Sequence, residues 1–201
     1  YSSKLPIFHC LFRQKNNMKL VILDRDGVIN QAAGETITSA NQWLPIDGSI
    51  EAIAQLHQKG FVVVLATNQP GLALGKFDLD DLEAMHAKLT HLVEEAGGAL
   101  GAIFYCPHGP DDRCNCRKPK PGLIDAIEAE FDISAEGIPL VGDNLRDLEA
   151  GLSKGCVPML VKTGNGQDTL NSLVAKPNEA FNSLLAFDDL ATATQHIIEN
   201  F

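Results

Sequence analysis

Two aspartates separated by one residue, Asp24 and Asp26, follow an apolar run and precede a glycine. A carboxylate in this position can attack phosphorus and form an aspartyl-phosphate. A second carboxyl group beside it can protonate the leaving oxygen and later take a proton from water. Because two neighbouring carboxylates repel each other, we expect a cation between them, and Mg²⁺ suits oxygen ligands and phosphate substrates. The alternative interpretation is a strand end with a plain Asp-Gly turn.

Two further segments carry polar side chains that could complete such a site. The hydroxyl of Thr67 could bind phosphoryl oxygens, with Asn68 and Gln69 beside it as substrate-binding candidates, although an ordinary polar turn would have the same composition. Asp143 could supply another carboxylate to Mg²⁺, and the adjacent Asn144 is a further substrate-binding candidate. An aspartate that caps the following helix is the alternative interpretation of Asp143, and the two roles are compatible.

The densest basic segment of the chain is RKPKPG, residues 117–122. Its three cations, Arg117, Lys118 and Lys120, precede a predicted helix, and Lys and Arg are the usual phosphate partners. A solvated basic stretch is the alternative. Asp147 lies one turn inside a later predicted helix and could hold a cation in place.

Four metal-binding side chains lie close together just before this basic segment. They are Cys106, His108, Cys114 and Cys116. This set fits a tetrahedral Cys₃His zinc site with no ligand missing, so we predict structural Zn²⁺ rather than incidental clustering of reduced cysteines. Because Cys116 directly precedes Arg117, the metal would hold the cations of the basic segment in place. The odd number of cysteines, five, points to the cytoplasm as the location.

Strands and helices alternate along the chain and must position these residues. The predicted strands are 19–23, 61–66, 102–105, 138–141 and 157–161, and the predicted helices are 49–59, 79–96, 121–131, 145–154, 167–175 and 187–199. Since the strands are continuous apolar runs, we predict an α/β fold with a doubly wound, mostly parallel sheet that helices cover on both faces. Ligands bind at the carboxyl ends of such strands, where three of the polar segments fall.

Domain organisation and composition limit the kinds of partner that the chain can bind. We expect one domain over 18–201 without a separate cap, and an extension outside that domain over 1–17. The chain has 201 residues, 16 basic and 26 acidic, and its net charge of -10 argues against non-specific nucleic-acid binding. It has no apolar run of about 18 residues, so we expect no membrane span. A small anionic substrate remains compatible with this charge, because a local basic cluster can act within an acidic protein.

Four motifs occur in the order that is typical of one enzyme family. They are Asp24-x-Asp26-Gly27, then Thr67, then Lys118, then Gly142-Asp143. The chain resembles the haloacid dehalogenase-like (HAD) phosphohydrolases from about residue 18 to residue 166. The cysteine-rich loop that runs into RKPKPG is similar to one subgroup of that family.

The resemblance implies a role for each of these positions. Asp24 would be the nucleophile and Asp26 the general acid and base. Asp24, the main chain of Asp26 and Asp143 would hold Mg²⁺. Thr67 and Lys118 would steady the transferring phosphoryl group.

The resemblance implies a small phosphorylated sugar as the partner, bound by a monomer, and the subgroup leaves two alternative substrates. The first is a heptose 1,7-bisphosphate that loses its C7 phosphate on the way to lipopolysaccharide heptose, and the second is histidinol phosphate. Arg117 would recognise the substrate. The subgroup commonly has an arginine where this chain has Leu74, so a contact made through that arginine is absent. A non-catalytic, zinc-stabilised binding module is the alternative outside enzymes.

Overall fold

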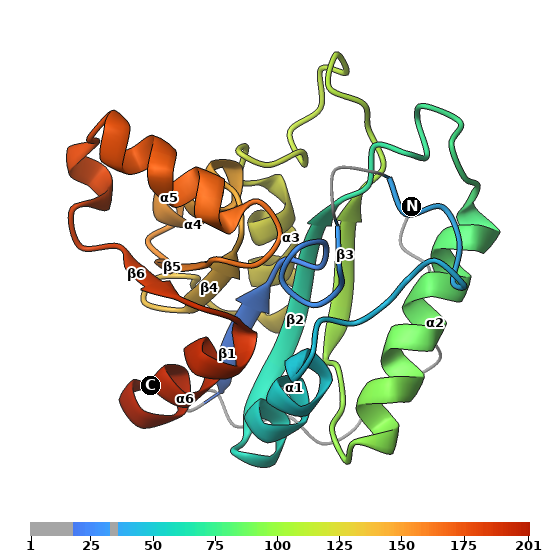
Figure 1. Cartoon of the computed structure of the whole chain (residues 1–201), viewed down its shortest axis with the longest axis horizontal. Helices are drawn as coiled ribbons and strands as arrows, with labels where there is room; N and C mark the ends of the chain where they lie inside the picture. The colour runs from blue at the N-terminus through green and yellow to red at the C-terminus, as the bar shows by residue number, and fades with distance from the viewer. Residues whose placement is uncertain (1–17, 33–35) are drawn as a thin grey trace.

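A parallel sheet forms the centre of the molecule (Figure 1). The computed structural model describes residues 18–32 and 36–201, and within them six strands pair in the order β3-β2-β1-β4-β5-β6. The strands are β1 (Lys19–Leu23), β2 (Phe61–Asn68), β3 (Ala102–Cys106), β4 (Pro139–Gly142), β5 (Val157–Val161) and β6 (Leu185–Phe187). Every pair of neighbouring strands is parallel. The predicted doubly wound parallel sheet is confirmed.

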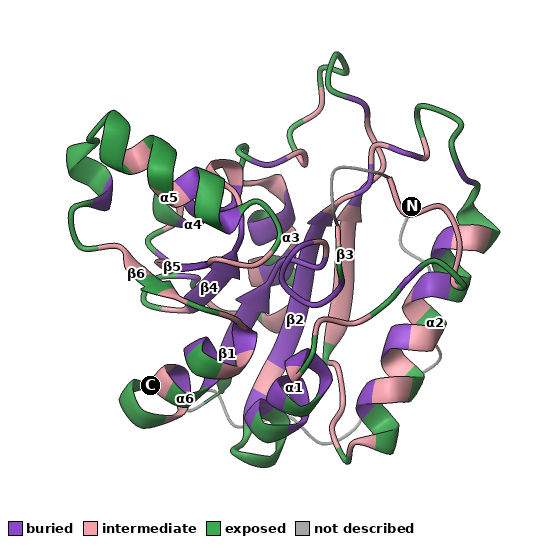
Figure 2. Ribbon diagram, viewed as in Figure 1, coloured by how far each residue is buried: buried purple, intermediate pink, exposed green. Residues whose placement is uncertain are grey.

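Helices cover both faces of this sheet. One face carries α1 (Ser49–Gln58), α2 (Leu79–Glu95) and α6 (Leu190–Asn200), which lie in front of it in Figure 1, and the other carries α3 (Gly122–Phe131), α4 (Leu145–Ser153) and α5 (Gly166–Ala175). Successive side chains of β1 alternate between the two cores: Val21 packs on the α1 side and Ile22 on the α3 side. The central strands are therefore buried along most of their length (Figure 2).

The C-terminal region differs from the prediction. A helix over 187–199 was predicted, but Phe187 ends strand β6, where it pairs with Val161 of β5. Helix α6 begins only after Asp189, whose side chain caps it by accepting a hydrogen bond from the Thr192 N–H at 2.8 Å. A strand of three residues is too short to show a period in the sequence, so the pattern does not distinguish it from the helix that follows.

The carboxyl ends of β1 and β4 meet where the strand order reverses. From β1 the chain continues to β2 and β3 on one side and later to β4 and β5 on the other. The Asp24 N–H, just past β1, donates to the Val141 carbonyl of β4 at 2.9 Å. A crevice forms outside the strands at such a point, and this is where ligands bind in open α/β sheets.

The remaining predictions about domains concern the loops and the termini. Within the described residues there is no separate cap domain and no helix of the length and apolarity that a membrane crossing requires. The predicted extension over 1–17 lies outside the described residues.

Candidate active site

A buried ion-pair network occupies the carboxyl end of β1. The ammonium nitrogen of Lys118 lies 2.9 Å from Asp24 Oδ1 and 2.7 Å from Asp147 Oδ1, and it donates a hydrogen bond to the Ala66 carbonyl at 2.6 Å. Lys118 and Asp24 are only 3% and 5% exposed. Burial opposes the charge of Lys118, but Asp147 and Asp24 outweigh it and raise the Lys118 pKa. The expectation that Asp147 braces a cation is confirmed.

Asp143 adds a third carboxylate to the group formed by Asp24 and Asp147. Oxygen atoms of these three side chains lie within 4.8 Å of one another, and we call them the carboxylate cluster. Asp143 Oδ2 accepts from the Asn165 N–H at 2.7 Å, whereas Asp143 Oδ1 is buried without a hydrogen-bond partner among the described residues. Oxygen donors with an unused buried acceptor fit Mg²⁺.

Two glycines allow the backbone to approach Asp143 closely. A Cβ atom at Gly27 would lie 2.1 Å from Asp143 Oδ2, and one at Gly164 would lie 2.3 Å from it. Both glycines have positive φ angles, 85° and 58°, which other residues adopt only with strain. Gly27 therefore has two functions: it allows the turn after Asp26, and it leaves room for the carboxylate of Asp143.

The carboxylate cluster is set up to bind a cation. Burial raises the pKa of Asp24 to about 7, with the neighbouring carboxylates adding to the shift and Lys118 opposing it. Burial likewise raises the pKa of Asp143 to about 6, against the hydrogen bonds from Asn165. A divalent cation between these groups would offset their repulsion and restore the charged forms.

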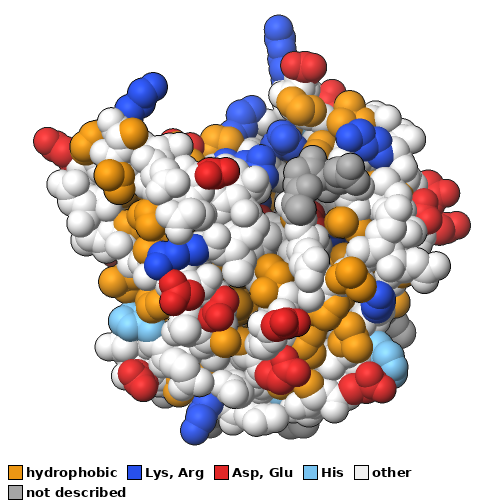
Figure 3. Space-filling model, in the orientation of Figure 1, with side chains coloured by type: hydrophobic (Ala, Val, Ile, Leu, Met, Phe, Trp, Pro, Cys, Tyr) orange, Lys and Arg blue, Asp and Glu red, His pale blue; other side chains and the backbone are white. Residues whose placement is uncertain are grey.

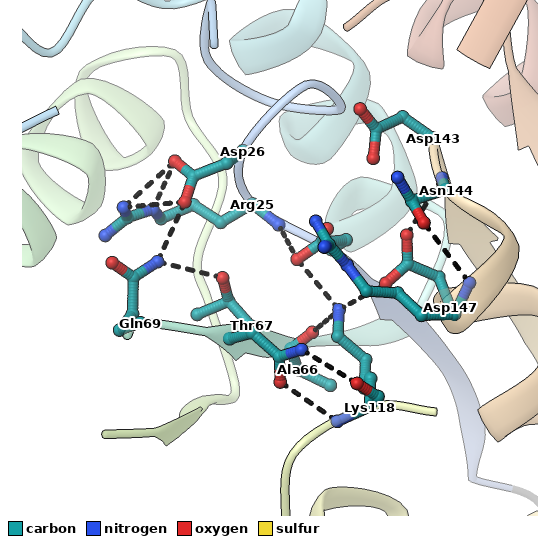
Figure 4. Close-up of polar contacts among 12 residues, drawn as sticks. Arg25, Asp26, Ala66, Thr67, Gln69, Lys118, Asp143, Asn144 and Asp147 are labelled. Atoms are coloured by element: carbon teal, nitrogen blue, oxygen red, sulfur yellow. Dashed lines mark hydrogen bonds and ion pairs between the residues drawn. The ribbon is translucent and has the colours of Figure 1, made fainter. Parts of the chain in front are cut away.

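Asp26 points away from the carboxylate cluster. Its oxygens accept hydrogen bonds from Arg25 Nε at 3.1 Å, Arg25 Nη2 at 2.9 and 3.0 Å, Asn30 Nδ2 at 3.0 Å and Gln69 Nε2 at 2.8 Å. Figure 4 shows Asp26 with Arg25 and Gln69 on one side of the Lys118 ammonium, and Asp143 and Asp147 on the other. Burial would raise the pKa of Asp26, but Arg25 and the hydrogen bonds outweigh it and hold that pKa below its ordinary value.

The polar residues at the end of β2 mainly position their neighbours. The Asn68 side-chain amide accepts a hydrogen bond from the Lys118 N–H at 3.0 Å and donates one to the Lys118 carbonyl at 3.1 Å. Gln69 donates to Thr67 Oγ1 at 3.0 Å as well as to Asp26, so Thr67 lies beside the acid–base candidate. The sequence predicted substrate contacts for Asn68 and Gln69, whereas in the structure their side chains bind other residues of the site.

Asn144 also binds other residues of the protein. Its side chain accepts from the Arg146 N–H at 3.3 Å, and its own N–H donates to Asp147 Oδ2 at 3.0 Å. These contacts form a capping box at the start of α4. The helix cap is therefore Asn144 rather than Asp143, which leaves Asp143 available to a ligand.

The cysteine-rich loop brings its four predicted ligands together. Ligand atoms of Cys106, His108, Cys114 and Cys116 all lie within 4.8 Å of one another. The Sγ atoms of Cys106 and Cys114 are 3.8 Å apart, and His108 Nδ1 lies 3.2 Å from Cys116 Sγ. A tetrahedron with Zn–S bonds of about 2.3 Å has edges of about 3.8 Å, so the four side chains fit zinc.

Two arginines lie beside the site. Arg117 is half-buried, and its Nη1 donates to the His108 carbonyl at 3.4 Å. Arg146 lowers the pKa of Asp143 as a minor contribution, and its Nε is buried without a hydrogen-bond partner in the described part of the chain. Figure 3 shows several Lys and Arg side chains near the notch at the upper edge of this face, with acidic side chains beside them and across the lower half. Cations are therefore available to an anion at this edge although the chain is acidic.

Sequence reasoning missed three residues of the site. Arg25 is the residue between the two aspartates and is 1% exposed, and Asn165 binds Asp143 through its N–H and its side-chain amide. His86 lies on α2, and its Nε2 is 3.2 Å from Arg25 Nη1. Arginine between two functional carboxylates is a signal that the sequence did contain.

Comparisons with known proteins agree with this geometry. The model of the HAD-hydrolase-like family matches residues 115–187. The D-glycero-β-D-manno-heptose-1,7-bisphosphate 7-phosphatase of Pseudomonas putida is 51% identical over 181 residues, which cover 90% of this chain and 100% of that protein. The protein of the same name from Pseudomonas aeruginosa is 49% identical over 90% of this chain and 98% of its own length.

A solved structure extends the similarity to three dimensions. The D,D-heptose 1,7-bisphosphate phosphatase of Bordetella bronchiseptica, complexed with magnesium and phosphate, superimposes with a TM-score of 0.86 at 45% identity. The match covers 92% of this chain and 100% of that one. The chain therefore belongs to the HAD-like phosphatases, in the family of the D-glycero-β-D-manno-heptose-1,7-bisphosphate 7-phosphatases.

Proposed function

We propose that this chain is a Mg²⁺-dependent phosphatase that removes the C7 phosphate of D-glycero-D-manno-heptose 1,7-bisphosphate during synthesis of lipopolysaccharide heptose. The observation that carries the proposal is the carboxylate cluster, with Lys118 between Asp24 and Asp147, at the switch point of the sheet. The names of the relatives that cover the whole domain support the substrate.

In the first step an oxygen of Asp24 attacks the phosphorus of the C7 phosphate. The bond between phosphorus and the C7 oxygen breaks, and that oxygen takes a proton from the carboxyl group of Asp26. The products are the heptose with a C7 hydroxyl and an aspartyl-phosphate on Asp24. Lys118, held by Asp147, stabilises the charge on the transferring phosphoryl oxygens together with Thr67.

In the second step a water molecule attacks the phosphorus of the aspartyl-phosphate. Asp26, now a carboxylate, takes the proton of that water, and inorganic phosphate leaves with restoration of the Asp24 carboxylate. The contacts of Asp26 with Arg25, Asn30 and Gln69 stabilise the carboxylate form that this step needs. The first step needs the protonated form of Asp26. One of the hydrogen bonds that Asp26 now accepts must therefore give way to a hydrogen bond that Asp26 donates to the leaving oxygen.

Two metals have separate roles in this proposal. Asp24, Asp143 and the main chain of Asp26 would hold Mg²⁺, which supplies charge neutralisation between the carboxylates and the phosphate. Zn²⁺ on the four ligands of the cysteine-rich loop would hold Arg117 and Lys118 in place and take no part in the reaction. The domain is proposed to act as a cytoplasmic monomer.

Substrate choice follows from charge. A bisphosphate carries a second anionic group, which Arg117 and Arg146 beside the site could bind, whereas histidinol phosphate carries an amine that these cations repel. A panel of the two substrates with Mg²⁺ tests this, and we expect kcat/KM for the heptose bisphosphate to exceed that for histidinol phosphate by about 10²-fold. A higher value for histidinol phosphate would assign the chain to histidine biosynthesis instead. The variant Arg117→Ala should reduce the ratio more than it reduces the hydrolysis of a generic phosphate ester.

A further inference from the structure

The side chain of Arg25 is buried next to the proposed acid–base residue. It is 1% exposed, and its Nε and Nη2 donate hydrogen bonds to the two oxygens of Asp26 at 2.9 to 3.1 Å. The remaining nitrogen, Nη1, lies 3.2 Å from Nε2 of His86 on helix α2. A planar guanidinium that binds a carboxylate through one edge has donors left on Nη1, and a partner there adds a second restraint on its orientation.

The chemistry of this contact determines the form of His86. A guanidinium has donors and no acceptor, so His86 Nε2 must be the acceptor and the ring proton must lie on Nδ1. Burial, and next the charge of Arg25, lower the pKa of His86 to about 3, while Asp26 opposes that shift. The imidazole is therefore neutral throughout the range in which a phosphatase works, and it carries no proton to or from the reaction.

Helix α2 holds the His86 ring at this position. The neighbouring Met85 and Leu89 are buried in the core between α2 and the sheet. The ring of Tyr105 on β3 lies against His86, with ring centroids 6.0 Å apart. A residue on α2 thus reaches the site through packing against the sheet.

We infer that His86 is a positioning residue of the reaction, which fixes the Arg25 guanidinium so that Arg25 holds Asp26 at the angle needed for proton transfer. The inference rests on the proposed function, because it assumes that Asp26 transfers the proton. It does not make His86 a catalytic residue, since two side chains separate it from the reacting atoms. Proton transfer depends steeply on geometry, and a displacement of about 1 Å can cost about 10²-fold in rate.

The kinetic test compares two substitutions at one position in the full-length enzyme with Mg²⁺. His86→Leu removes the acceptor, and we expect kcat to fall by about 10- to 100-fold with little change in KM. His86→Gln places an amide oxygen near the position of Nε2, and we expect it to recover most of the lost kcat. Because a purely structural role would not separate Gln from Leu in this way, the recovery is the informative readout.

The matched control is His91, which lies on the same helix and pairs with Glu95 at 3.4 Å on the surface. His91→Leu should leave kcat and KM unchanged. Thermal unfolding of each variant shows whether it is folded. A folded His86→Leu with kcat within twofold of the wild type, or a His86→Gln as slow as His86→Leu, would overturn the inference.

A second measurement does not depend on turnover. In ¹⁵N NMR spectra of the wild type, the His86 ring should be the neutral Nδ1–H tautomer between pH 5.5 and 8.5. A protonated ring at pH 5.5, or a proton on Nε2, would contradict the contact with Arg25. A wild type that hydrolyses no phosphate ester would overturn the proposed function instead, whatever the tautomer of His86.

Discussion

The two groups of metal-type ligands in this molecule are positioned in opposite ways. The carboxylate cluster lies just beyond β1 and β4 and is buried. Lys118 pairs with Asp24 and Asp147, and the Asn165 N–H binds Asp143. The cysteine-rich loop leaves β3 after Cys106, its tip over 110–113 is exposed, and Cys114 and Cys116 are half-buried. The sheet therefore positions the first group, whereas the second would take its fixed geometry from the zinc that we propose it binds.

Lys118 connects these two regions. It follows the cysteine-rich loop in the chain, yet its side chain ends between Asp24 and Asp147. Asn68 on β2 holds its backbone through two hydrogen bonds. Disorder in the cysteine-rich loop should therefore lower the catalytic rate only partly, because Asn68 on β2 still positions Lys118.

The largest expected effect is at the centre of the carboxylate cluster. Asp24→Asn keeps the shape of the side chain but removes the nucleophile, so we expect kcat to fall by about 10³-fold or more with the fold intact. Asp26→Asn removes the proton carrier and should cost about 10²- to 10⁴-fold. The exposed Asp80→Asn serves as the control and should retain full activity. Near-normal turnover by Asp24→Asn would rule out the covalent mechanism.

The next effect concerns Lys118 as the link between the regions. Lys118→Met leaves two buried carboxylates without their counter-ion, which costs about 3–5 kcal/mol of unfolding free energy, and it should lower kcat by about 10²-fold or more. Lys120→Met, two residues further on at an exposed position, should change both by little. Denaturant unfolding and steady-state kinetics measure the two effects, and equal results for the two variants would remove Lys118 from the site.

A smaller effect on turnover is expected in the cysteine-rich loop. Cys114→Ser should lose the bound zinc, lower the melting temperature and raise KM, while kcat falls less than in Lys118→Met. Cys156 is buried and is not one of the four grouped ligands, so Cys156→Ala should keep one zinc per chain. Metal analysis of the purified proteins decides the matter. Wild-type protein without zinc, with thiols that react freely, would show that the loop is ordered in some other way.

The smallest effect is a pH dependence confined to the carboxylate cluster. Burial raises the pKa of Asp24 to about 7 and that of Asp143 to about 6, above the ordinary value of about 3.9. Their stabilising contribution in the metal-free protein is therefore present below about pH 4 and is lost as the pH rises through 7. Mg²⁺ binds the charged carboxylates, which predominate at the higher pH. Mg²⁺ should therefore raise the melting temperature more at pH 8 than at pH 5.5.

Asp143→Asn should remove most of that difference between the two pH values. Asp188→Asn, at an exposed position paired with Lys162, is the control and should preserve it. An equal Mg²⁺ effect at pH 5.5 and pH 8 in the wild type would contradict the shifted pKa values of the carboxylate cluster.

Much of the site could be predicted because local patterns place it. An apolar run that ends in Asp24 identifies a strand and its carboxyl end at once, and the same holds for Asp143. Parallel strands bring such ends to one edge of a sheet, so the two carboxylates meet without any knowledge of the packing. The cysteine spacing likewise identifies its four ligands within one loop.

The rest depends on contacts between segments that are far apart in the chain. The partner of Asn68 lies 50 residues away at Lys118, and the partner of His86 lies 61 residues away at Arg25. A polar side chain next to a site has the same sequence signature whether it binds substrate or another residue. Strand β6 was missed for a similar reason, because its pairing with β5 rather than its own three residues makes it a strand.

The most direct test of the central claim is to follow heptose 1,7-bisphosphate by ³¹P NMR in the presence of the wild type and Mg²⁺. We expect the C7 phosphate resonance to be replaced by that of inorganic phosphate while the C1 phosphate remains, and we expect Asp24→Asn to leave both resonances unchanged. Loss of the C1 phosphate first, or hydrolysis that continues in Asp24→Asn, would contradict that claim.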